Sequence, residues 1–243
     1  MRVAIFSAFP HEAKKTIKRT GATNTGKECP FEVFHARYSS HDITLVLTGM
    51  GIGNAENALK YVLERYTPDV VLSAGFGGAL YDGACIGEIV VASRAFYVTE
   101  AVVDSVELQN GDMIERLSGQ LPIREGSIVT VEKWKTKSEL GRILTGDILY
   151  PVCDMETFGL TKLSIQKNLR FFAIRSITDR RDEEIPYELL DVSDESGRYR
   201  PGRALWLLLS NPRLIPESIK LGIHARTAGN SLWEAVRCIL EAL

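Results

Sequence analysis

Three carboxylic acids follow apolar, strand-like segments of this 243-residue chain. In chain order, Glu12 follows Val3–Ala8, Glu156 follows Leu149–Cys153 and Asp179 follows Phe171–Thr178. The carboxyl ends of parallel strands meet at one edge of an open α/β sheet, so we expect the three side chains to face one crevice. Carboxyl groups there can donate a proton, accept one, or accept hydrogen bonds from a ligand. For any one of these acids alone, helix capping is the plainer interpretation.

Two glycine-rich segments lie at further strand ends. The first, Gly49-Met50-Gly51-Ile52-Gly53, precedes a helical pattern, a context in which backbone N–H groups can receive an anion or a polar ligand. It departs from the dinucleotide fingerprint because Asn54 stands at the sixth position, which disfavours NAD or FAD binding. The second, Gly75-Phe76-Gly77-Gly78, predicts a tight turn with positive φ. Together the segments indicate a ligand-binding edge.

Short Val/Ile-rich runs alternate with helical patterns and predict an α/β fold, namely a three-layer α/β/α sandwich around a mixed, mostly parallel central sheet. Strands are expected at Val3–Ser7, Ile43–Thr48, Val70–Ala74, Glu88–Ser93, Ser127–Val131 and Phe171–Thr178. Helices are expected at His11–Arg19, at Asn54–Tyr66 with Asn54 as its cap, at Lys137–Leu144, at Glu156–Lys167 and beyond Pro216. Phe31–Tyr38 and Ile43–Thr48 are expected to pair as a hairpin.

The absence of a repeat or a low-complexity linker predicts a single domain over residues 1–243. Within it, residues 183–243 form a variable loop and helical C-terminal extension, because a breaker-rich loop from Asp179 to Pro201 precedes the apolar run Ala204–Leu209 and a terminal amphipathic pattern. This much apolar surface needs a cover.

Composition excludes several classes of function. The net charge of -2, from 29 basic and 31 acidic residues, gives no reason to expect nucleic acid as a partner. The cysteines form no CxxC pair and the histidines show no ligand spacing, so we expect no metal and no redox cofactor. No apolar run is long enough to cross a bilayer or to form a signal peptide, which predicts a cytoplasmic protein.

Several motifs, taken together and in this order, resemble the nucleoside phosphorylase/nucleosidase superfamily. They are Gly49-Met50-Gly51-Ile52-Gly53, Ala74-Gly75-Phe76-Gly77-Gly78 followed by Gly87-Glu88-Ile89-Val90-Val91, Asp154-Met155-Glu156, and Arg175-Ser176-Ile177-Thr178-Asp179. The similarity runs from Met1 to about Asp182 and is greatest to the methylthioadenosine/S-adenosylhomocysteine nucleosidases. It implies a nucleoside phosphorylase-like fold, a small-molecule nucleoside substrate and a homodimer.

The resemblance also implies a division of labour among the acids. Cleavage of an N-glycosidic bond passes through an oxocarbenium-like sugar, so the leaving base must be protonated and the attacking water deprotonated. Asp179 would protonate purine N7, for which burial must keep it protonated near neutral pH. Glu12 would orient and deprotonate the water, and Glu156 would accept hydrogen bonds from the ribose hydroxyls.

Seven further residues are expected at the substrate by the same resemblance. Met155 would pack on the sugar, Trp134 would stack on the base and Arg175 would lie near the site, while Gly51, Phe76, Gly77 and Gly78 would line it. Core filling, packing on its own domain and a structural ion pair remain the alternatives for Met155, Trp134 and Arg175. Phe76 stands where that branch has Ser, which leaves the base pocket open to variation.

The nucleophile and the 5′ substituent are separate questions. No Arg occurs in Ser7–Glu12 or Thr67–Tyr81, where phosphorylases bring arginines to phosphate, so we expect hydrolysis with phosphorolysis as the alternative. A non-catalytic nucleoside- or dinucleotide-binding protein is the alternative from another class. The tail, including Asp194-Glu195-Ser196-Gly197-Arg198, is similar to hopanoid-associated nucleosidases, which release adenine from adenosylhopane. A lipid-like substrate would imply peripheral membrane contact, although the apolar tail fits a subunit interface or an internal cover at least as well.

Overall fold

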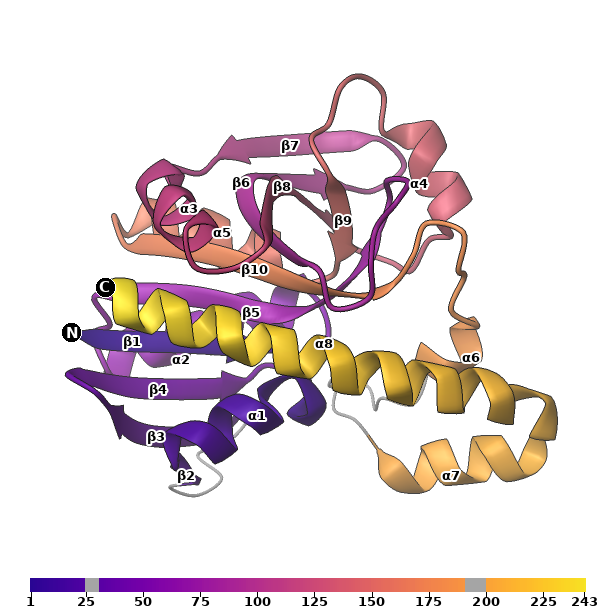
Figure 1. The fold of residues 1–243 in the computed structure, drawn as a ribbon, viewed down its shortest axis with the longest axis horizontal. Helices are drawn as coiled ribbons and strands as arrows, with labels where there is room; N and C mark the ends of the chain where they lie inside the picture. Colours follow the sequence, from indigo (N-terminus) through magenta and orange to yellow (C-terminus); the bar gives the residue numbers. More distant parts are fainter. Residues whose placement is uncertain (25–30, 191–199) are drawn as a thin grey trace.

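The computed structural model describes residues 1–24, 31–190 and 200–243, and in them a mixed ten-stranded sheet carries helices on both faces (Figure 1). The strands are β1 (Arg2–Ser7), β2 (Thr23–Asn24), β3 (Glu32–Tyr38), β4 (His41–Leu47), β5 (Val70–Ala79), β6 (Ile89–Val98), β7 (Val102–Glu107), β8 (Ile123–Val131), β9 (Pro151–Asp154) and β10 (Arg170–Asp179). The helices are α1 (Pro10–Thr20), α2 (Ile52–Arg65), α3 (Gly111–Ser118), α4 (Lys137–Ile143), α5 (Thr157–Gln166), α6 (Tyr187–Leu190), α7 (Pro201–Ser210), the short 3₁₀ helix η1 (Pro212–Leu214) and α8 (Ile215–Ala242).

Strand β5 is the centre of the sheet because it pairs in parallel with both β1 and β10. Beyond β1 the sheet continues through β4, β3 and β2. On the other side, β10, β6, β8 and β9 lead back to the end of β5, so five strands close into a ring. The predicted α/β layers and the β3–β4 hairpin are confirmed. The ring was not predicted, and its antiparallel β10–β6 and β5–β9 pairs make the sheet more mixed than the mostly parallel one expected.

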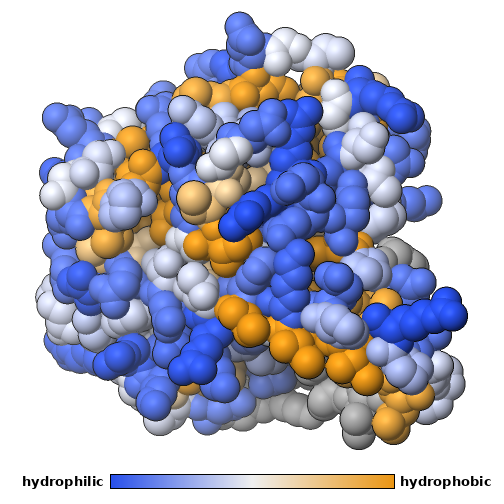
Figure 2. All heavy atoms as spheres, turned by 45° about the vertical axis from the view of Figure 1, so that its right-hand side comes forward, coloured by the Kyte–Doolittle hydropathy of each residue, from blue (hydrophilic) through white to orange (hydrophobic). Residues whose placement is uncertain are grey.

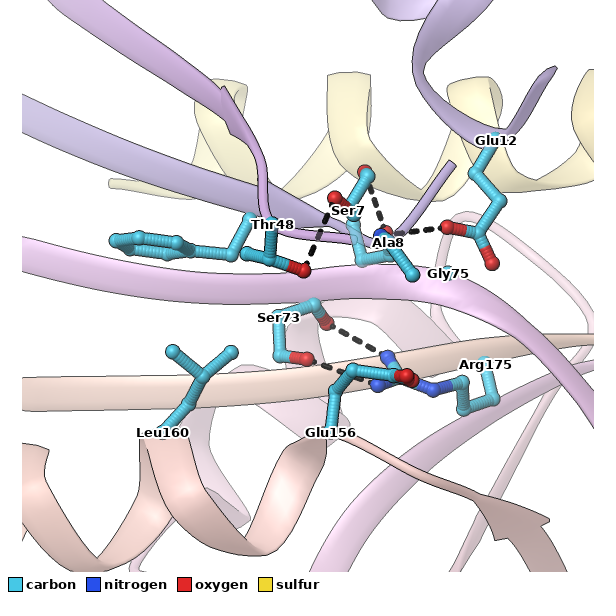
Figure 3. Close-up of a pocket in the computed structure, with 11 residues that line it drawn as sticks. Ser7, Ala8, Glu12, Thr48, Ser73, Gly75, Glu156, Leu160 and Arg175 are labelled. Atoms are coloured by element: carbon cyan, nitrogen blue, oxygen red, sulfur yellow. Dashed lines mark hydrogen bonds between the residues drawn. The ribbon is translucent and has the colours of Figure 1, made fainter. Parts of the chain in front are cut away.

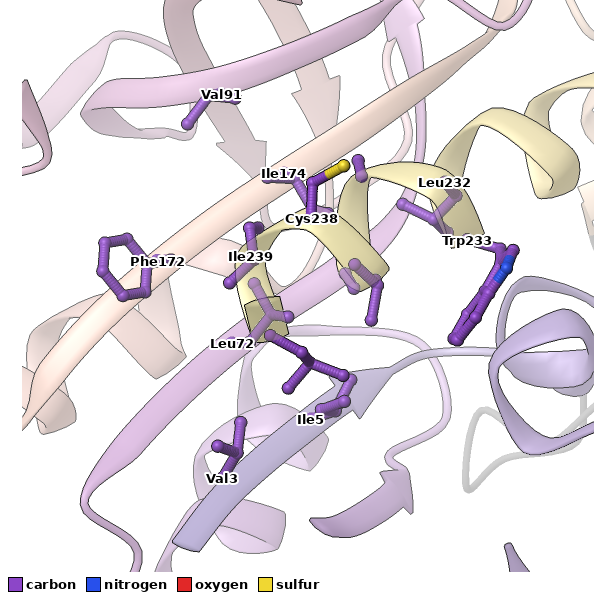
Figure 4. Packing of buried hydrophobic residues seen from close by; sticks show 14 of the residues in the cluster. Val3, Ile5, Leu72, Val91, Phe172, Ile174, Leu232, Trp233, Cys238 and Ile239 are labelled. Carbon is purple, nitrogen blue, oxygen red and sulfur yellow. The ribbon is translucent and has the colours of Figure 1, made fainter. Parts of the chain in front are cut away.

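Both faces of the sheet are buried, which explains why its strands read as nearly continuous apolar runs. In β1, Val3 and Ile5 belong to one core cluster with residues of α8 (Figure 4). Their neighbours Ala4 and Phe6 belong to a second cluster with residues of α2 and α5. This alternation is the period of two that a strand imposes on its side chains.

Only the C-terminal half of helix α8 packs on the sheet. Its buried residues run from Ala228 to Leu240 and pack on β5 and β10, whereas the N-terminal half extends past the strands beside α7 (Figure 1). The predicted C-terminal helix is confirmed and begins at Ile215. Helix α6 interrupts the predicted loop from Asp179 to Pro201, and the motif at 194–198 lies outside the described residues.

The prediction of a tight turn at Gly75-Phe76-Gly77-Gly78 is wrong, because these residues continue β5 in extended conformation. Their need for glycine comes from close approach instead. A Cβ on Gly77 would lie 2.4 Å from Val152 Cγ1, and one on Gly78 would lie 2.5 Å from Asp179 Oδ2. Missing side chains therefore let β9 and Asp179 close onto the end of β5.

Gly159 plays a similar part between α5 and α2. A Cβ at this position would lie 2.9 Å from the carbonyl oxygen of Ile52, in the first turn of α2. The N-termini of the two helices are therefore held close together, an arrangement that the site described below uses.

We expect Gly159→Ala to lower the free energy of unfolding by about 1–3 kcal/mol, since the added methyl group meets backbone that cannot easily move. Gly141→Ala in α4 is the matched control, because its Cβ would meet nothing within 4 Å. Urea titration of both variants measures the difference. Equal stability of the two variants would contradict the close α2–α5 contact.

Candidate active site

Glu12 lies in the first turn of α1 and binds three backbone N–H groups. Its Oε2 accepts from Ala8 at 2.8 Å and Phe9 at 3.0 Å, and its Oε1 accepts from Phe76 on β5 at 2.9 Å. The side chain is 6% exposed. The helix-capping interpretation is therefore right for Glu12, and the bond to Phe76 additionally ties the carboxylate to the edge formed by β5.

Glu156 reaches from the start of α5 to the N-terminus of α2, where its Oε1 accepts from the backbone N–H of Gly51 at 2.8 Å. Gly51 has φ of 103°, a conformation that favours glycine. The glycine segment thus binds a carboxyl group of the protein itself. The prediction that Asn54 caps α2 is wrong: Gly51 is the cap, and the Asn54 amide donates to the carbonyl of Met50.

Arg175 and Asp154 form a buried ion pair behind these carboxyls. Arg175 Nη2 lies 2.5 Å from Asp154 Oδ2, and both side chains are at most 3% exposed. Ser73 and Thr157 accept further hydrogen bonds from the guanidinium group. The predicted ion-pair alternative for Arg175 is therefore correct, and its charge is already compensated.

A small cavity joins these groups (Figure 3). Glu12 reaches it from α1, Glu156 from the start of α5, and Arg175 from β10. Ser7, Thr48 and Gly75 also line it, and its volume of about 10 Å³ is room for about one water molecule. Two carboxyl groups with space for a single water between them can orient that water and take its proton.

Asp179 ends β10, about 10 Å along the sheet from Glu12, because Glu12 approaches Gly75 and Asp179 approaches Gly78 on the same strand. Its Oδ2 lies 2.5 Å from Nζ of Lys137, and its Oδ1 accepts from Thr178 Oγ1 at 2.7 Å. Both members of the ion pair are buried. Asp179 is therefore buried beside a cation, a neighbour that the sequence did not predict.

A larger cavity of about 380 Å³ opens at Asp179. Its walls are the end of β10, residues 182–186, Leu189 and the N-terminal half of α8, including Leu221 and His224. This volume is in the range that small-molecule ligands occupy. His224 Nδ1 lies 2.9 Å from the carbonyl oxygen of Thr178 and so holds α8 against the strand end.

The remaining predicted residues lie at different depths around these cavities. Phe76 is half-buried and packs against the His11 ring, with centroids 5.5 Å apart, while Gly77 faces Val152. Met155 is half-buried against the cluster that contains Leu80 and Leu140, which supports the core-filling alternative. Trp134 is half-buried before α4 and lines neither cavity.

Sequence reasoning missed Lys137, Asp154 and His224. The Thr136–Glu139 capping box marks the start of α4 in the sequence, yet nothing local indicates that Lys137 meets Asp179. The motif Asp154-Met155-Glu156 gives no local sign that Asp154 pairs with Arg175. Within residues 1–24, 31–190 and 200–243, no group of three or more His, Cys, Asp or Glu side chains could hold a metal ion.

The pKa of Glu156 is raised to about 8, first by burial and then by the nearby charge of Asp154, while the Gly51 hydrogen bond opposes the shift. Glu156 therefore holds a proton near neutral pH in the free protein. A neutral carboxyl group at this position can both donate a hydrogen bond to a hydroxyl group and accept one from it.

A mixed sheet between helices, with acids gathered where β1, β5 and β10 end, defines a nucleoside phosphorylase-like α/β protein. The chain belongs to the Phosphorylase superfamily, whose model matches residues 2–205. It is similar to the 5′-methylthioadenosine/S-adenosylhomocysteine nucleosidase of Shewanella oneidensis, at 23% identity over 90% of this chain and all of the relative.

Solved structures share the fold. The futalosine hydrolase of Helicobacter pylori superposes with a TM-score of 0.75 at 13% identity and covers 100% of this chain and 98% of its own. The S-adenosylhomocysteine nucleosidase of Streptococcus pyogenes, in complex with 5-methylthiotubericidin, gives 0.73 at 14% identity, covering 100% and 97%. The predicted fold class and superfamily are therefore confirmed.

The raised pKa of Glu156 predicts that the stability of the folded protein depends on pH. Between about pH 5 and 8 the folded chain keeps a proton that unfolded Glu releases, so the free energy of unfolding falls as the pH rises. Glu156→Gln removes this dependence. As the pH rises, its free energy of unfolding should therefore increase relative to that of wild type, by up to about 1 kcal/mol per pH unit. Denaturation across this range, with the exposed Glu125→Gln as control, measures the effect. If the free energies of unfolding of wild type and Glu156→Gln changed with pH in the same way, the raised pKa of Glu156 would be contradicted.

Proposed function

We propose that this protein hydrolyses the N-glycosidic bond of a purine nucleoside, an adenosine modified at its 5′ position, and releases adenine. One observation carries the proposal: Glu12 and Glu156 share a cavity the size of a water molecule, while Asp179 lies at a ligand-sized cavity further along the same sheet edge. The relatives named above, which are nucleosidases and a hydrolase, support the same reaction class.

In the proposed mechanism the nucleoside spans the two cavities. Asp179 donates a proton to purine N7 as the C1′–N9 bond breaks, and the bonding electrons leave with the base. The Glu12 carboxylate takes a proton from the water that adds to C1′. Glu156 binds the ribose hydroxyl groups, and its hydrogen bonds strengthen as positive charge develops on the sugar.

The charges around the small cavity favour water over phosphate as the nucleophile. A phosphate dianion needs an uncompensated cation, and the cation that the described residues place at this cavity, Arg175, is paired with Asp154. Glu12 would also repel a second anion. Phosphorolysis is therefore the weaker alternative. Nucleoside binding without catalysis is also the weaker alternative, because it does not explain a water-sized cavity between Glu12 and Glu156.

Adenine release from 5′-methylthioadenosine tests this proposal. We expect wild type to release adenine and a free sugar in phosphate-free buffer, and Asp179→Asn or Glu12→Gln to lower kcat by about 100-fold or more. Glu125→Gln is the control. Base release that requires phosphate and yields a sugar phosphate would establish phosphorolysis instead, and full activity of Asp179→Asn would remove Asp179 from the acid role.

The C-terminal extension supports a finer proposal about the 5′ substituent. Helix α8 turns Glu217, Lys220, Leu221 and His224 toward the large cavity, and Ile215, Ile219 and Ile223 lie on its opposite face. Ile219 and Ile223 are 60% and 61% exposed. Trp206 and Leu209 of α7 are also exposed, and we call Trp206, Leu209, Ile219 and Ile223 the apolar face. Figure 2 shows a band of apolar side chains, coloured orange, that reaches its lower right.

We propose that this apolar face lies on an anionic membrane surface and that the accepted 5′ group is lipid-like, as in adenosylhopane. The face carries exposed Arg213 and Arg226 on the same helical hairpin, and Trp206 suits the interface between headgroups and acyl chains. None of the helices within the described ranges is long and apolar enough to cross a membrane. In this proposal residues 1–243 act as one domain in the cytoplasm, and the homodimer that the family resemblance implies uses another surface.

Vesicle sedimentation tests the membrane contact. Wild type should sediment with vesicles containing phosphatidylglycerol more than with neutral vesicles, and Ile219→Ser/Ile223→Ser should lower the bound fraction several-fold. Val103→Ser is the control, since Val103 is 57% exposed on β7, far from the hairpin. If wild type did not bind either kind of vesicle, the proposed membrane contact would be wrong. Conversion of a dimer to a monomer by the double variant would assign the face to a second copy of the chain.

A further inference from the structure

Lys137 is the least expected member of the site. It begins α4, its side chain is 6% exposed, and Nζ lies 2.5 Å from Asp179 Oδ2. The same ammonium group donates a hydrogen bond to the carbonyl of Arg180, and the backbone N–H of Lys137 donates to Glu184 at 2.9 Å. Both ends of the residue are therefore fixed, and its charge points at the group that must deliver a proton.

The ion pair creates a chemical requirement. A general acid has to carry a proton before it can give one, and the ammonium group of Lys137 is the proton donor that lies next to Asp179. The proton that Asp179 gives away can come from this ammonium group. Its transfer to oxygen is short, because donor and acceptor already lie at hydrogen-bond distance.

We propose that Lys137 is a positioning residue that stores the proton for Asp179 and passes it to Oδ2 as the base departs, an inference that rests on the proposed function. The Nζ–H bond breaks and an Oδ2–H bond forms, and Asp179 then gives its proton to purine N7. The electron pair of the C1′–N9 bond stays on the purine. Water adds to C1′ and loses a proton to Glu12. After the products leave, Glu12 releases that proton to solvent and Lys137 takes one up from solvent, so both groups return to their starting states.

The groups that face the pair come from several elements. Cys153 on β9 is neutral, because burial raises the pKa of its thiol to about 12, and its Sγ donates to the carbonyl of Gly78. Glu184 is bound to the start of α4, and Glu183 is paired with Lys220 of α8 at 2.8 Å. Asp182 and His224 also line the cavity at Asp179. Among the described residues, Lys137 is the cation within salt-bridge distance of Asp179.

The pH dependence of kcat separates proton storage from a purely structural role. In Lys137→Met, Asp179 must bind its proton from solvent, so kcat for adenine release should fall at least 100-fold at pH 8 and recover toward wild type as the pH is lowered. The kcat of wild type should change much less with pH than that of Lys137→Met at pH 8 and below. Lys137→Arg keeps the charge and should keep Tm, but kcat stays low because a guanidinium group does not release its proton.

A substrate that leaves without protonation gives a second readout. With 4-nitrophenyl riboside, Lys137→Met should stay within about threefold of wild type, since nitrophenolate needs no acid. Equal losses on both substrates, wild-type kcat with an unchanged pH profile in Lys137→Met, or full rescue by Lys137→Arg would overturn proton storage while leaving hydrolysis intact. Failure of wild type to cleave either substrate would overturn both the proposed function and this inference.

Discussion

The burial of charge at one sheet edge is the constraint on which the rest of this molecule depends. Glu12, Asp154, Arg175 and Asp179 are each at most 7% exposed, although charged groups lose their hydration when they enter a protein interior. Each has a specific partner: three backbone N–H groups bind Glu12, Arg175 and Asp154 pair with each other, and Asp179 pairs with Lys137. The fold must therefore bring several strand and helix ends together before any of these groups is stable.

Strand β5 allows these segments to meet because it has glycines at the positions where the acids contact it. Gly75 admits the Glu12 carboxyl, with Oε1 only 3.0 Å from where a Cβ would lie, and Gly78 admits Asp179. The same absence of side chains lets β9 close the ring of strands. Packing of α5 against α2 does the equivalent for Glu156, since Gly159 allows the approach that joins Glu156 to Gly51. The same close contacts that stabilise the buried charges also surround the two cavities, one the size of a water molecule and one large enough for a nucleoside.

Local sequence patterns were sufficient for the main strands and helices and for the acids, whereas β7, α3 and α6 were not predicted. Apolar runs identified the main strands, and the positions of Glu12, Glu156 and Asp179 after them placed all three at the edge. What failed depends on contacts between distant segments. Glycines at 75, 77 and 78 fit a turn equally well until β9 and Asp179 are seen against them. Lys137 and Asp154 carry no local signal either, because an ion-pair partner is chosen by the fold rather than by spacing.

Binding of a transition-state mimic tests most directly whether the three acids form one site. The ligand is an adenosine analogue with a 5′-methylthio group and a cationic nitrogen in the sugar ring, measured by calorimetry. This account predicts that wild type binds it at least 100-fold more tightly than 5′-methylthioadenosine, and that Glu12→Gln, Glu156→Gln and Asp179→Asn each weaken binding at least tenfold while remaining folded. Wild-type affinity in any one of these variants would contradict a site built from all three carboxyl groups.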